Sequence, residues 1–257
     1  MRFHAIALVA WSGLAACGFD LGTDLSPPVS DAAPDGDPID SAVDAPATID
    51  VAAPAVPMIV QQQARYAGSG SPLDLALTAN PASGNTLVMI GAANQGNLSG
   101  VTGGGVTTWL RAARSATNAN VEIWFGVTDG SQATVSISRT GNTGPIWLAI
   151  SEWSGLGASV ALDQAIASDG TSGTASAGTI ATTSARDLLI FAAADENSAT
   201  FGAPSPGSWT GFATIGGGSI RQAAWYQLTS ATGTYGPQVT TSGAIWDAAL
   251  VALRVAP

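Results

Sequence analysis

The feature that most constrains the fold is an internal repeat with a spacing of about 100 residues. Four landmarks recur in the same order: 87–90 (LVMI) with 188–191 (LLIF), Trp109 with Trp209, 122–125 (EIWF) with 223–226 (AAWY), and 146–147 (IW) with 245–246 (IW). A period of this length is too long for one coil of a solenoid. It predicts two pseudo-repeats, about 58–167 and 168–257, whose sheets share one core. Two tandem small sandwiches are the alternative.

Each half has the residue patterns of β-strands. Val121, Ile123 and Phe125 alternate with more polar positions, which is the period of a strand with one buried face. Segments 146–153 and 245–255 are more continuously apolar, as central strands buried on both faces are. The chain also contains 31 glycines, and no segment has a helical period. These patterns predict an all-β domain, a jelly-roll-like β-sandwich.

The first residues have the pattern of an export signal. Arg2 precedes a short apolar run at 5–11, which is too short to span a bilayer as a helix. The segment 14–16 (LAA) then leads into Cys17, and this resembles the lipobox of bacterial lipoproteins. The resemblance implies removal of the signal peptide, 1–16, and acyl lipids on Cys17 that anchor the chain to a membrane. An ordinary secretory peptide with a chance cysteine is the alternative.

Residues 17–57 are predicted to form a lipidated, disordered tether. The segment 18–57 has eight aspartates, no basic residue and few large apolar side chains to offset the entropy of ordering. It carries −8 of the net charge of −10, so residues 58–257 are close to neutral. A nucleic-acid partner is therefore not expected. Gly18 stands where enteric-type bacteria place an aspartate to retain lipoproteins at the inner membrane, so sorting to the outer membrane is favoured.

The residue inventory excludes several kinds of catalysis. The one histidine, His4, leaves with the signal peptide, the chain has no lysine, and Cys17 is consumed by lipid. The mature chain therefore lacks an imidazole base, a free thiol and a side-chain amine, which excludes serine–histidine triads and His/Cys zinc sites. It also has no Gly-x-Ser-x-Gly elbow and no P-loop motif. We expect a non-catalytic protein with no cofactor other than its lipid.

Two sets of oxygen-bearing residues remain as candidate sites. A glycoside hydrolase needs two carboxyls about 5–10 Å apart, and Glu122 and Glu152, each near a tryptophan on an expected strand, are the candidate pair. Ordinary arginine-paired or solvent-facing strand residues are the alternative. Asp195, Glu196 and Asn197 follow an expected strand and are candidate Ca²⁺ ligands, with a solvated turn as the alternative.

Two tryptophans are the candidate ligand-binding residues. Alternation places Trp124 on the strand face of Glu122, and Trp225 on the face of Arg221 and Gln227. Each repeat therefore has a tryptophan on the more polar side of the same strand. An exposed indole pair is a platform on which sugar rings stack. The alternative is that loops or a second sheet cover both indoles as part of the core.

Several short motifs resemble a family of β-sandwich modules found in exoproteins of soil bacteria and in phage virion proteins. They are 84–88 (GNTLV), 152–156 (EWSGL), 186–189 (RDLL), 206–210 (PGSWT) and 225–226 (WY). The acidic tether behind a lipobox also looks like that of lipoproteins from myxobacterial relatives. The resemblance implies a fold and a location outside the cytoplasm, and it implies no catalytic residues.

Three functions are consistent with these observations. The first is an envelope lipoprotein whose β-sandwich domain binds or adheres, with a glycan or another envelope component as partner. The second is a purely structural envelope protein without a small-molecule site. The third is a carboxylate-dependent glycoside hydrolase. Exposure of Trp124 and Trp225 distinguishes the first two, and the third requires two acids that face each other across a cleft.

Overall fold

The computed structural model describes residues 55–94, 96–116, 120–141, 144–196, 200–215, 221–243 and 245–255. The predicted signal peptide, Cys17 and the tether up to residue 54 lie outside the described residues, as does Asn197. The described part of the chain is all-β, which confirms the predicted fold class. It includes no helix of the length and apolarity needed to cross a membrane.

The first half contributes a large and a small antiparallel sheet. The large sheet has, in spatial order, β1 (Met58–Ala67), β8 (Ile146–Ser154), β3 (Thr86–Ala93), β6 (Val121–Val127) and β5 (Leu110–Arg114). The small sheet has β2 (Leu73–Ala76), β7 (Thr134–Gly141) and β4 (Gly96–Gly103).

The second half has a similar division. Its large sheet has, in spatial order, β13 (Thr210–Ile215), β14 (Arg221–Leu228), β12 (Asp187–Asp195), β17 (Trp246–Arg254) and β9 (Ala161–Gly170). Opposite it lie two short pairs, β10 (Thr174–Ser176) with β16 (Gln238–Thr240) and β11 (Ile180–Ala181) with β15 (Thr234–Tyr235).

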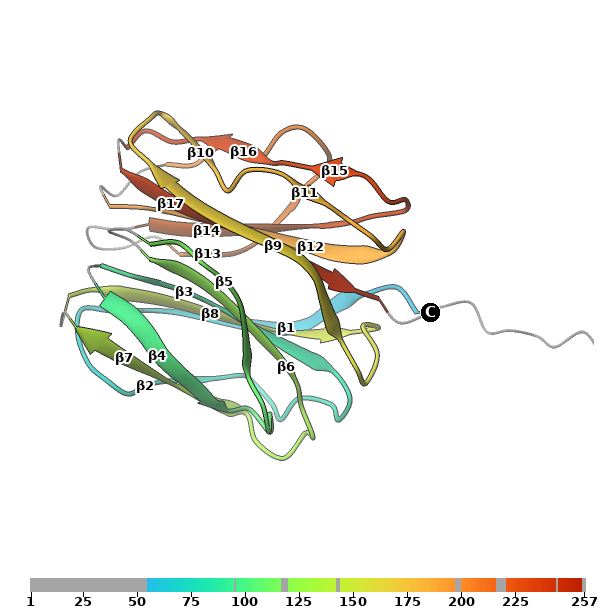
Figure 1. Cartoon of the computed structure of the whole chain (residues 1–257). Helices are drawn as coiled ribbons and strands as arrows, with labels where there is room; N and C mark the ends of the chain where they lie inside the picture. Colours follow the sequence, from blue (N-terminus) through green and yellow to red (C-terminus); the bar gives the residue numbers. More distant parts are fainter. Residues whose placement is uncertain are drawn as a thin grey trace, which may run out of the picture. The chain divides into compact units, whose positions relative to one another are not determined.

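The sheets stack in four layers, with the two large sheets in the middle (Figure 1). Three apolar clusters fill the spaces between the layers. The inner cluster combines residues of both halves, such as Ile90 and Phe125 with Ile190 and Val251. Each outer cluster belongs to one half. The halves therefore share the inner cluster, and each half also has an apolar cluster of its own.

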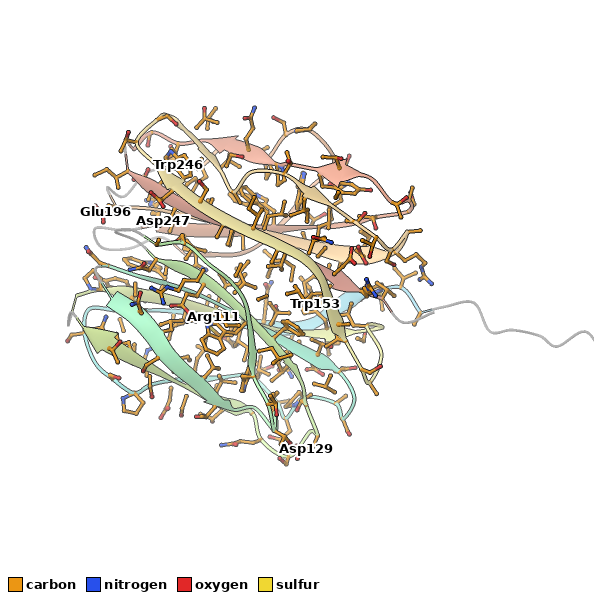
Figure 2. The ribbon with its side chains drawn as sticks, in the orientation of Figure 1. Arg111, Asp129, Trp153, Glu196, Trp246 and Asp247 are labelled. Atoms are coloured by element: carbon orange, nitrogen blue, oxygen red, sulfur yellow. The ribbon has the colours of Figure 1, made fainter. Side chains whose placement is uncertain are left out.

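Aromatic contacts join the halves at the inner cluster. Trp153 of β8 is fully buried between the large sheets (Figure 2). Its ring packs edge-on against Tyr226 at 5.0 Å and Phe212 at 5.8 Å, both from the second half. Its indole N–H donates to Ser151 Oγ at 2.8 Å, so the polar end of the ring is also satisfied.

The two large sheets have the same strand order, and their registers correspond residue by residue. Met89 lies opposite Trp124 and Ile150, and Phe191 lies opposite Trp225 and Leu250. All of these except Trp124 are buried in the outer clusters, and Trp124 packs against its cluster from a half-buried position.

These registers correct the predicted alignment of two landmarks. The match of 87–90 with 188–191 pairs Leu87, which faces an outer cluster, with Leu188, which faces the inner one. The match of Trp147 with Trp246 fails in the same way, since Trp147 faces the inner cluster and Trp246 an outer one. A shift of one residue reverses the face of every side chain on a strand. The landmark that contains Trp124 and Trp225 and the landmark of Trp109 and Trp209 were aligned in register.

Candidate functional site

The predicted platform of two exposed tryptophans is not present. Trp225 is only 8% exposed, and its ring stacks on Phe191 at 5.6 Å. Trp124 is half-buried and packs against the outer cluster of the first half. The strand face that looked polar in the sequence is a covered face in both halves. The small sheet covers it in the first half, and the two short strand pairs cover it in the second. The prediction of exposure is therefore wrong for Trp225, and the pair cannot act as one open surface.

Glu122 holds Trp124 in place instead of forming an open site. Its carboxylate is fully buried and accepts hydrogen bonds from the Leu98 N–H at 2.9 Å and the Trp124 indole at 3.0 Å. Arg111 lies 3.6 Å from the same carboxylate, with its guanidinium 5.4 Å from the centre of the Trp124 ring. Burial raises the pKa of Glu122, and the hydrogen bonds and Arg111 oppose that rise.

Glu152 lies at a different end of the same outer cluster. It is fully buried and accepts hydrogen bonds from Gln61 Nε2 at 2.6 Å, the Ala82 N–H at 2.8 Å and Asn85 Nδ2 at 2.6 Å. These bonds tie β1 and the loop before β3 to β8.

The register also separates Glu152 from Glu122. Glu152 lies opposite Leu87 and Glu122 opposite Gly91, so four residues of β3 and two strand spacings lie between them. Strand dimensions make that about 16 Å between backbones, whereas glycosidase carboxyl pairs are about 5–10 Å apart. The two acids do not face each other across a cleft.

Two of the three predicted calcium residues, Asp195 and Glu196, lie in the described part of the chain. Asp195 is fully buried, lies opposite Arg221 in the register, and accepts a hydrogen bond from Thr241 Oγ1 at 2.8 Å. Glu196 lies near Asp247 at one end of the sheets (Figure 2). Burial raises the pKa of Glu196, and Asp247 and Asp195 raise it further. Among the residues described, no three acidic, histidine or cysteine side chains are grouped as metal ligands.

A further buried carboxyl group, that of Asp187, lies at the start of β12 and was not singled out in the sequence. Asp187 has no exposed surface, and its pKa is raised to about 6 by burial and by the negative charge of neighbouring Asp163. Burial also opposes ionisation of Asp163, but hydrogen bonds from Thr183 and Arg254 outweigh it and lower its pKa to about 2. Arg254 donates from Nε and Nη2 to Oδ1 of Asp163, at 3.0 and 2.7 Å. These contacts fasten the bulged strand β9 to β17 and the loop before β12.

The second half also has a small pocket with aromatic walls. It has a volume of about 210 Å³ and opens between the beginning of β13, the end of β14 and β15. Its lining consists of Pro206, Gly207, Trp209, Gln227, Thr234, Tyr235 and Gly236, none of which is charged. Gln227, one of the predicted ligand-binding residues, therefore lies in a pocket, whereas the other members of that set do not line it.

The two aromatic side chains of the pocket are held by their polar ends. The Trp209 indole donates to the carbonyl of Pro206 at 3.0 Å, and the Tyr235 hydroxyl donates to the carbonyl of Ala231 at 3.0 Å. Phe191 of the outer cluster supports the Trp209 ring at 6.1 Å. Both rings therefore contribute apolar surface in fixed positions, while their own hydrogen-bonding groups are occupied.

The amide of Gln227 is the unsatisfied polar group of the pocket. Its Oε1 is buried and has no hydrogen-bond partner in the described structure. Gly207 lies against it with a φ of +104°, and a Cβ at that position would approach Oε1 to 2.8 Å. Position 207 therefore requires glycine for two reasons. The backbone conformation disfavours other residues, and the Gln227 amide leaves no room for a side chain.

The corresponding place in the first half is filled. Gly126 lies opposite Leu87 as Gln227 lies opposite Leu189, and buried Val106 packs directly over it. A Cβ on Gly126 would come within 2.3 Å of Val106 Cγ1. Equivalent positions on β6 and β14 therefore differ in their surroundings: packed aliphatic side chains in the first half and an aromatic pocket in the second.

Sequence reasoning missed the pocket although it found two of its residues. Trp209 was recognised as a repeat landmark and Gln227 as a polar neighbour of Trp225. Their association with Tyr235 depends on how the short β15 packs over the large sheet, and nothing in the local pattern around Tyr235 indicates that. Comparison with protein-family models, with curated proteins and with solved structures finds no significant match to this chain.

Proposed function

We propose that this chain is a non-catalytic envelope lipoprotein whose β-sandwich domain binds a glycan through the pocket between Trp209 and Tyr235. The observation that carries the proposal is the pair of fixed aromatic rings around an unsatisfied amide. Aromatic rings pack against the C–H faces of sugar rings, and a few fixed polar groups set the orientation of a ligand in such a pocket.

The chemistry of the lining supports a neutral ligand of limited size. No charged side chain lines the pocket, so it provides no ion-pairing partner for a charged ligand. Its volume of about 210 Å³ is below the range of about 300–1,000 Å³ typical for drug-sized ligands. One sugar ring at the end of a glycan chain suits this space better than several rings do.

The N-terminal pattern supports the proposed location. The Leu-Ala-Ala-Cys segment that ends at Cys17 resembles a lipobox, and Gly18 favours sorting to the outer membrane. The acidic segment 18–57 would separate the lipid from the binding domain, since like charges and prolines keep such a segment extended.

A glycan-array screen with the purified protein tests this proposal, with Trp209→Ala and Trp109→Ala as matched variants. Both tryptophans are half-buried, pack against an outer cluster and donate to a nearby backbone carbonyl, but only Trp209 lines the pocket. We expect wild type and Trp109→Ala to bind the same glycans and Trp209→Ala to lose them. Absence of glycan binding by the wild type would favour the purely structural role.

A further inference from the structure

We infer that the sugar ring taken by this pocket carries an acetamido group, whose N–H donates to Oε1 of Gln227. The inference rests on the proposed function and concerns the class of sugar. It starts from the fact that Oε1 is the buried side-chain oxygen of the lining for which the described structure provides no donor.

Leaving such an acceptor unpaired is unfavourable in the free protein. The cost of an unsatisfied buried polar group is regained when a ligand supplies the missing partner. The terminal torsion of a glutamine side chain is soft, so a small rotation turns Oε1 from Gly207 toward the pocket. A ligand with a donor at that point is therefore favoured over one without.

The surroundings of the amide favour an N–H donor over a hydroxyl. The Trp209 indole and the Tyr235 hydroxyl already donate to backbone carbonyls, so neither is free to donate to a ligand oxygen. A sugar hydroxyl bound to Oε1 would keep two lone pairs that need donors beside these aromatic walls. An amide N–H is a donor only, and one bond to Oε1 satisfies it, while the carbonyl oxygen of the acetamido group lies two bonds away and can accept from water at the pocket opening.

The second part of an acetamido group also suits the pocket. Its methyl is apolar and would lie against the Trp209 or Tyr235 ring. The uncharged lining disfavours the ammonium of an unacetylated amino sugar, because that group would lose water without gaining an anionic partner. Acetylation of the amine is thus what makes an amino sugar compatible with this site.

Titration of the purified protein with N-acetylglucosamine, glucose, glucosamine and N-methylacetamide tests the inference. The readout is tryptophan fluorescence, supported by nuclear magnetic resonance. We expect N-acetylglucosamine to bind about three- to tenfold more tightly than glucose, which corresponds to one net hydrogen bond. N-methylacetamide should bind more weakly than the acetamido sugar because it lacks the ring.

Variants of Gln227 assign the preference to its amide. Gln227→Met keeps the length of the side chain and should abolish the preference for the acetamido sugar. Gln227→Glu keeps an acceptor oxygen and should retain it. Gln164→Met, at a half-buried position on β9 away from the pocket, is the matched control and should bind as wild type does. Thermal melts of each variant show which of them are folded.

The possible results separate this inference from the proposed function. Equal binding of glucose and N-acetylglucosamine, or a preference that survives in Gln227→Met, overturns the acetamido assignment and leaves a sugar-binding pocket. Binding of N-methylacetamide as tight as that of the sugar overturns the assignment to an amino sugar. Failure of every sugar to bind overturns the proposed function and this inference together.

Discussion

Replacement of Asp187 by asparagine should stabilise the domain at neutral pH and have little effect in acid. Asp187 is fully buried beside Asp163, and its pKa is raised to about 6 from an ordinary value of 3.8. The folded chain therefore holds a proton on Asp187 that the unfolded chain releases between these two values. Stability falls as the pH rises through this window, because the unfolded state binds fewer protons there.

The size of the effect follows from the two pKa values. A group with a pKa of about 6 when folded and 3.8 when unfolded destabilises the folded state by ~3 kcal/mol above pH 7. Asparagine resembles the protonated carboxyl in shape and cannot ionise. Asp187→Asn should thus raise the free energy of unfolding by up to ~3 kcal/mol at pH 8 and leave it nearly unchanged at pH 4.

Urea unfolding at pH 4, 6 and 8 measures this difference. Asp169→Asn removes an exposed carboxyl from β9, the edge strand of the same sheet, and it should change stability by less than ~0.5 kcal/mol at each pH. Equal stabilisation of Asp187→Asn at pH 4 and pH 8, or a variant less stable than wild type at pH 8, would rule out a raised pKa of Asp187 as the source of the pH dependence. Either result would mean that Asp187 is ionised in the folded protein at no cost.

Three further outcomes are expected. Trp225→Ala should cost ~3–5 kcal/mol of stability by chemical denaturation, as other buried tryptophan truncations do, whereas a cost below ~1 kcal/mol would contradict its place in the outer cluster. Residues 58–167 expressed alone should aggregate or stay unfolded in a circular dichroism melt, since the apolar face around Trp153 would lose its cover; a soluble, cooperatively melting fragment would show that the shared core is dispensable. Cys17→Ser should release the protein from membranes in a carbonate-wash fractionation, and a variant that still sediments with membranes would contradict the lipid anchor.

The sequence was sufficient for the all-β fold class. Strand alternation and continuously apolar segments were enough for it. The faces were harder to assign, because the strands of the large sheets are buried on both sides. The segment 188–194 is apolar at every position, so alternation cannot tell its inner face from its outer face, and a slip of one residue went unnoticed.

The candidate site was harder to predict for a different reason. Glu122 looked like a marker of a polar face, yet it is a buried acceptor that Leu98 of a sequence-distant strand satisfies. Asp163 lies at a bulge in β9, and β17 separates that strand from β12, where Asp187 lies, so the meeting of the two acids depends on long-range packing. The pocket likewise joins a turn before β13 to a two-residue strand, and such long-range packing leaves no periodic signal in the sequence.

A heteronuclear correlation spectrum of the indole N–H groups during titration with N-acetylglucosamine tests most directly whether the pocket at Trp209 binds a sugar. We expect the Trp209 signal to shift with saturable, about millimolar affinity while the Trp109 signal stays in place, because only Trp209 lines the pocket. An unchanged Trp209 signal at saturating concentrations of every sugar tested would contradict the assignment of a glycan-binding site to this pocket.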